Sequence, residues 1–212
     1  MKKGLPRELI LAVFAAALPA SAAVYVWTGA AGTDFADAAN WLVGDAVPSA
    51  PPANSDSTDL IVLPATVTVN QPVLTTNQDV RGLTIEGAGW TLTTGDFTFR
   101  VGPHNVGVTT TYTNGTSAID GNLRVGTTDT PRTCWTVAGG GVLRIDGTIG
   151  RYGNGGGATR KEGNGTLELN TGTTAVNALI VNGGIVRAIN GGGGLNKTPL
   201  TLSKGVYDLN GN

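Results

Sequence analysis

The sequence predicts an all-β protein folded as a right-handed parallel β-helix, which is a β-solenoid with coils of about 20 residues. Short segments alternate apolar and polar side chains, as in Thr66-Val-Thr-Val69, which is typical of strands with one buried face. Glycine accounts for 33 of 212 residues and charged residues for only 14%, a composition that disfavours amphipathic helices. A glycine-led motif also recurs along the chain.

The motif is a glycine followed by apolar residues or alanine two and four positions later. Its five copies begin 20, 24, 19 and 21 residues apart, at Gly121, Gly141, Gly165, Gly184 and Gly205. An interval near 20 residues is typical of one solenoid coil, whose inward side chains are buried only when the next coil stacks on them. A β-sandwich is the alternative, because pairs such as Asn114-Gly115 and Asp146-Gly147 also suit hairpin turns.

The chain divides into three predicted segments. Residues 1–22 are typical of a signal peptide, with Lys2 and Lys3 before an apolar run from Leu9 to Leu18 and a cleavage site after Ala22. The run is too short for a lasting membrane anchor. Residues 23–65 are expected to form an N-terminal cap with a Pro-rich loop, and residues 66–212 the solenoid. We therefore expect export across the inner membrane.

The two ends of the solenoid carry separate expectations. Trp27 and Trp41 are expected to plug the N-terminal end of the core, and residues 34–40 to form one helical turn. The chain stops just after a repeat copy, without a polar cap. An uncovered coil exposes unpaired backbone groups, so we expect an N-terminal fragment that continues in further coils.

Composition excludes several functions. Removal of residues 1–22 leaves 11 basic and 14 acidic residues without a basic stripe, which argues against nucleic-acid binding. One cysteine, Cys134, cannot form an internal disulfide and is expected to be a small buried residue. His104 is the only histidine. We therefore expect no metal, no cofactor and no catalytic residue.

Four residues are candidates for contact with a glycan. Asp120 and Asp146 each precede a glycine and could approach each other on adjacent coils. A glycosidase needs two carboxyl groups roughly 5–10 Å apart, although Asp-Gly pairs are also ordinary turn residues. Trp90 and Trp135 could stack on sugar rings, or they could fill the interior of the coils.

Two segments resemble a known family. The stretch Gly163-Asn-Gly-Thr-Leu-Glu-Leu-Asn170, with Val181-Asn-Gly-Gly-Ile-Val186 after it, resembles the autotransporter-associated β-strand repeat. Trp27-Thr-Gly29 followed by Asn40-Trp41 resembles the opening of large secreted proteins with such repeats. Together the matches cover about a third of the chain. The resemblance implies a β-helix passenger on the cell surface of a Gram-negative-type bacterium, in a long protein that ends in a membrane β-barrel or a sorting tail.

These observations predict an extracellular structural or adhesive repeat protein without enzymatic activity. Its expected partners are surface polysaccharide or extracellular matrix. The alternative is a carbohydrate-binding or polysaccharide-degrading β-helix protein that uses the two aspartates and the tryptophans.

Overall fold

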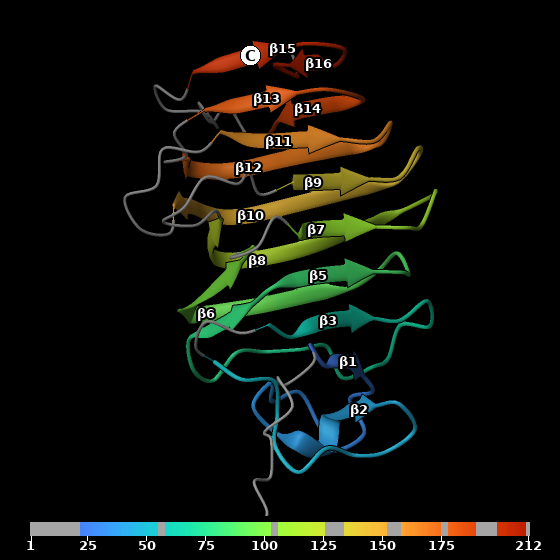
Figure 1. Ribbon diagram of the computed structural model, residues 1–212. Helices are drawn as coiled ribbons and strands as arrows, with labels where there is room; N and C mark the ends of the chain where they lie inside the picture. Colours follow the sequence, from blue (N-terminus) through green and yellow to red (C-terminus); the bar gives the residue numbers. More distant parts are fainter. Residues whose placement is uncertain are drawn as a thin grey trace, which may run out of the picture.

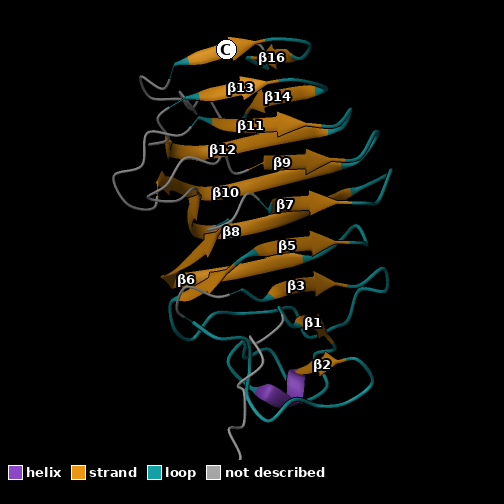
Figure 2. Cartoon of the chain, viewed as in Figure 1, coloured by secondary structure: helices purple, strands orange, loops and turns teal. Residues whose placement is uncertain are grey.

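The chain folds into a column of stacked parallel strands (Figure 1). The computed structural model describes residues 22–54, 58–102, 106–125, 134–151, 158–174, 178–189 and 199–210. Strands dominate these residues, with one short helix near the N-terminal end (Figure 2). None of the helical residues described forms a segment long and apolar enough to cross a bilayer. Residues 1–21 of the predicted signal peptide and His104 lie outside the described residues, and so does the side chain of Cys134, which is expected to be buried.

Two sheets run the length of the column. Sheet A has nine strands and sheet B has seven, and from β3 onward successive strands belong to the two sheets in turn. The strands of sheet A are β1 (Val24–Trp27), β2 (Trp41–Val43), β3 (Leu60–Leu63), β5 (Gly82–Ile85), β7 (Gly107–Thr110), β9 (Cys134–Val137), β11 (Thr159–Glu162), β13 (Leu179–Val181) and β15 (Leu200–Leu202). The strands of sheet B are β4 (Gln78–Val80), β6 (Thr91–Val101), β8 (Thr116–Val125), β10 (Val142–Arg151), β12 (Thr166–Thr174), β14 (Ile185–Ala188) and β16 (Val206–Asp208).

The pairing confirms the predicted parallel β-solenoid, although the segment Thr66–Val69, which alternates like a strand, is not part of any strand and Val69 is 96% exposed. All strand pairs are parallel except β1 with β2, which is antiparallel. Inward side chains form columns across the coils. In sheet B one column runs Leu143, Leu167, Val186 and Tyr207, and the first three of these are at most 1% exposed. Each layer of the core is therefore kept dry by the layers on either side.

The register corrects one copy of the predicted repeat. The copies that begin at Gly141, Gly165, Gly184 and Gly205 do stack on one another. Gly121 instead lies opposite Gly147, in the middle of the neighbouring strand. The first copy therefore belongs to a different corner of the coil. Both corners have a glycine followed by an alternating strand, so the sequence pattern alone does not distinguish them.

A column of glycines bends the long strands of sheet B. Gly95, Gly121 and Gly147 lie in register and have φ values of +56°, +113° and +139°. Residues with side chains rarely adopt positive φ, whereas glycine does so at no steric cost. A Cβ atom at Gly147 would also overlap the carbonyl oxygen of Gly121. The bend turns the second part of each strand onto a third face of the column.

The N-terminal end of the core is closed by aromatic residues. Trp27, Phe35 and Trp41 are at most 1% exposed, and the ring of Trp41 lies 4.9 Å from Trp27 and 4.7 Å from Phe35. Trp41 donates its Nε1–H to the carbonyl oxygen of Phe35. A 3-10 helix, Ala38–Asn40, carries the chain over this plug, and Asp37 accepts a hydrogen bond at its start. The expected plug and the expected helical turn are both confirmed.

We expect Gly147→Ala to lower the free energy of unfolding by more than about 2 kcal/mol. The positive φ alone costs about 1–3 kcal/mol for a residue with a side chain, and the overlap with Gly121 adds to that cost. Gly95→Ala is the matched control, because Gly95 has positive φ but open space around its Cβ position. Urea unfolding followed by far-UV circular dichroism measures both variants. Equal losses would show that close approach of the coils does not constrain this corner.

Candidate functional site

The two candidate aspartates meet on the outer surface of sheet B. Asp120 on β8 pairs in register with Asp146 on β10, and Asn170 on β12 follows in the same column. Adjacent strands lie about 4.8 Å apart, so the two carboxylates project from neighbouring rungs. Asp120 is exposed and Asp146 is half-buried. The expectation that these residues come within reach of each other is therefore confirmed.

Asp146 is held by protein donors on both sides. Its Oδ2 accepts a hydrogen bond from Nε of Arg144 at 2.7 Å, and its Oδ1 accepts one from Nδ2 of Asn170 at 2.7 Å. A general acid or nucleophile needs an oxygen that reaches the substrate. Both oxygens of Asp146 already have partners, so this carboxylate stabilises the contact between neighbouring coils.

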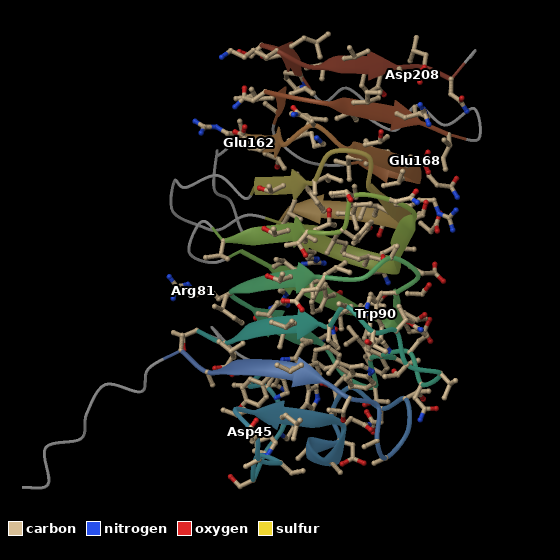
Figure 3. The ribbon with its side chains drawn as sticks, turned by 90° about the vertical axis from the view of Figure 1, so that its right-hand side faces the viewer. Asp45, Arg81, Trp90, Glu162, Glu168 and Asp208 are labelled. Carbon is tan, nitrogen blue, oxygen red and sulfur yellow. The ribbon has the colours of Figure 1, made fainter. Side chains whose placement is uncertain are left out.

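The two candidate tryptophans lie inside the column and not on its surface. Trp90 is 0% exposed and donates its Nε1–H to the carbonyl oxygen of Pro64 at 2.7 Å. Trp135 is 2% exposed and stacks in a core column next to Val108. Neither ring can stack on a sugar, and the other interpretation, that these residues fill the coils, is confirmed. Figure 3 shows Trp90 among the stacked side chains of the core.

A ladder of alternating charge runs beside the aspartate column. Arg144, Glu168, Arg187 and Asp208 occupy one outward position on four successive coils. Arg187 bonds Glu168 at 3.2 Å and Asp208 at 2.8 Å. Hydrogen bonding from Arg187 lowers the pKa of Asp208. Glu168 and Asp208 lie along the same side of the column (Figure 3).

The sequence reasoning missed a buried lysine. Lys161 on β11 is 0% exposed, although lysine is almost never buried without partners. It pairs in register with Trp135 below and Val181 above, so it occupies a position in a core column. Its Nζ donates to three carbonyl oxygens, those of Glu162 at 2.9 Å, Gly163 at 2.8 Å and Gly183 at 3.1 Å. One ammonium group thus ties together the turns of two successive coils.

Burial weakens the affinity of Lys161 for its proton. Desolvation lowers the pKa of Lys161 to about 8, and the nearby Glu162 carboxylate opposes that change. The segment Thr159–Glu162 is polar throughout, so the sequence indicated neither a strand there nor which of Arg160 and Lys161 points inward. The in-register neighbours Trp135 and Val181 carry that information.

The outer surface offers no metal centre among the described residues, where no group of three or more His, Cys, Asp or Glu side chains converges. No family model matches the chain, and no curated protein or solved structure is significantly similar to it. The function must therefore be inferred from the fold and from its surface chemistry.

The buried Lys161 makes the free energy of unfolding depend on pH in the alkaline range. The folded protein releases the Lys161 proton above about pH 8, whereas the unfolded chain keeps it up to about pH 10.5. Because the unfolded state then binds more protons, this lysine makes stability rise with pH between those values. We expect the free energy of unfolding of the wild type, relative to Lys161→Met, to increase from pH 7.5 to pH 9.5. The slope stays below about 1.4 kcal/mol per pH unit, the limit for one proton.

The matched control is Lys204→Met, since Lys204 is exposed. Burial raises the pKa of Tyr112, but this residue is common to all three proteins and cancels in the difference. Urea unfolding at three pH values gives the comparison. A flat difference between wild type and Lys161→Met would contradict a buried, titrating ammonium group.

Proposed function

We propose that this chain is an exported structural or adhesive repeat protein of the autotransporter-associated β-strand type. It would act as the N-terminal part of a larger protein on the surface of a Gram-negative-type cell. The observation that supports this role best is the continuous parallel pairing from β3 to β15 in one sheet and from β4 to β16 in the other. Two unbroken ladders make a stiff column, which suits a stalk that holds its corner segments toward a surface or a matrix.

The last described coil supports the idea of further coils. Leu200 and Leu202 continue core columns in register with Leu179 and Val181, yet they are 36% and 51% exposed. Another coil stacked on β15 and β16 would bury these side chains and pair their open backbone edge. We propose that further coils of the same kind are the partner of this edge.

Export is the part of the proposal that can be tested first. Expressed in a Gram-negative host, the chain should lose residues 1–22, and N-terminal sequencing should begin at Ala23. Val13→Arg is the control, because a charge in the apolar run from Leu9 to Leu18 should stop export. A wild-type protein that keeps its first residues and stays in the cytoplasm would overturn the proposal.

A second candidate function is the degradation of a polysaccharide. The observation that favours it is the in-register pair Asp120 and Asp146, since a retaining glycosidase uses two carboxyl groups about 5 Å apart. The hydrogen bonds that occupy both oxygens of Asp146 favour the structural role instead.

A polysaccharide panel separates the two functions. We expect the purified chain to release neither reducing ends nor unsaturated products from any polymer tested. We also expect Asp146→Asn to lower the urea midpoint, because it weakens the bond with Arg144. Activity that is present in the wild type and lost in Asp146→Asn would reverse this ranking.

A further inference from the structure

The third face of the column carries a charge pattern unlike that of the part of sheet B that precedes the glycine corner. This face consists of β4 and of the parts of β6, β8, β10 and β12 that follow the corner. Its outward positions form two columns, one of Thr98, Asn122 and Thr148, and one of Asp79, Arg100, Arg124 and Gly150. A neutral column of hydrogen-bonding groups thus lies beside a column that contains two arginines on adjacent rungs.

The two arginines are only partly neutralised. Arg100 bonds Asp79 through Nη1 and Oδ2 at 3.0 Å. Arg124 is exposed, and within the described part of the chain it makes no hydrogen bond or ion pair. Like charges directly opposite each other in a sheet are destabilising. The pair Arg100 and Arg124 differs from the arginines before the glycine corner of sheet B, where Arg144 and Arg187 each bond a carboxylate.

The next rung leaves room along the column. Gly150 lies opposite Arg124, and a Cβ atom added there would stand 3.5 Å from Cγ of Arg124. The aliphatic part of Arg124 therefore lies beside a position that has no side chain of its own. Its guanidinium group is exposed, and among the described residues it is free to approach a ligand that lies along the face.

The neutral column supplies matching hydrogen-bonding groups. Thr148 donates its hydroxyl to Oδ1 of Asn122 at 2.8 Å, which fixes the amide so that Nδ2 points elsewhere. That Nδ2 has no hydrogen-bond partner in the described part of the chain. Sugar hydroxyls suit such amide and hydroxyl groups, and guanidinium groups bind carboxylates and sulfates in two-pronged geometry.

Arg81 extends the positive charge around the corner. It follows Asp79 by two residues and precedes β5, and its side chain is half-buried at the edge of the column (Figure 3). Its Nε is buried without a hydrogen-bond partner among the described residues. The column itself carries one carboxylate, that of Asp79, and two guanidinium groups, those of Arg100 and Arg124.

We propose that the third face binds an anionic polysaccharide, with Arg124 contacting its acidic groups and Asn122 its hydroxyls. The sugars would lie over Gly150, the position beside Arg124 that has no side chain, within reach of both Arg124 and Asn122 on β8. This inference rests on the proposed adhesive function and names its ligand class. It places the contact on a different face from the buried tryptophans and from the aspartate column.

Binding of polygalacturonate to the purified chain tests the proposal, measured by isothermal titration calorimetry at low and moderate salt. We expect saturable binding that weakens with salt. Arg124→Gln should weaken it by about fivefold, as expected for one exposed charged contact. Arg144→Gln is the matched control, since Arg144 is another partly exposed arginine on the neighbouring face. It should change the affinity by less than about twofold.

The remaining arms identify the anion and the kind of polymer. Heparin in place of polygalacturonate distinguishes recognition of sulfate from recognition of carboxylate. Binding of either polymer supports the proposal if the binding is weakened by Arg124→Gln. Neutral dextran should not bind. Equal binding by wild type and Arg124→Gln, an equal loss in Arg144→Gln, or equal binding of single-stranded DNA would overturn it. Export is assayed separately in cells. A chain that is not exported contradicts the proposed function, whereas an exported chain that does not bind the polymer contradicts only this binding site.

Discussion

The stacking of one coil on the next is the constraint on which the whole structure depends. An isolated coil has no interior, because its strands are three to eleven residues long and its inward side chains have water on both sides until neighbours cover them. Parallel pairing at about 4.8 Å supplies that cover and satisfies the backbone at once. It also forces chemically similar positions into register, so every column of the surface repeats or alternates its chemistry from rung to rung.

The same constraint explains how far the sequence could be interpreted. The spacing of Gly141, Gly165, Gly184 and Gly205 predicts the register of β10, β12, β14 and β16 because each glycine precedes the same inward pair. The copy at Gly121 misleads because a coil has more than one corner, and each corner places a glycine before an alternating strand. Only pairing in three dimensions tells these corners apart.

The candidate site was predictable in part for a related reason. Asp120 and Asp146 each precede a glycine, which suggested that they could approach each other, but the predicted repeat aligned Gly121 with Gly141. The observed register, with Gly121 opposite Gly147, is what brings the two aspartates together. Burial does not follow from the repeat. The run Cys134–Val137 predicts a strand at Trp135, whereas the all-polar segment Thr159–Glu162 predicts none at Lys161. For both residues the inward or outward choice depends on the neighbours in register. Tryptophan satisfies its one polar group through a single hydrogen bond, whereas Lys161 needs the three carbonyl oxygens that the turns of two coils bring together.

The outer faces of the column differ in how fully their charged side chains are paired with one another. In-register stacking places neighbouring charges about 4.8 Å apart, so alternation in sign stabilises a column, and like charges in register need other partners. Asp146, opposite Asp120, has Arg144 and Asn170 as such partners. The column of Arg144, Glu168, Arg187 and Asp208 alternates, and Arg187 bonds the acid on either side. Such a column already satisfies its own charges and has little left for a ligand. The column of Asp79, Arg100 and Arg124 does not alternate after its first pair, and Arg124 faces solvent beside a glycine. In this fold each outward side chain lies next to the side chains of the neighbouring coils. A charged side chain that those neighbours do not neutralise is the one that can bind another molecule.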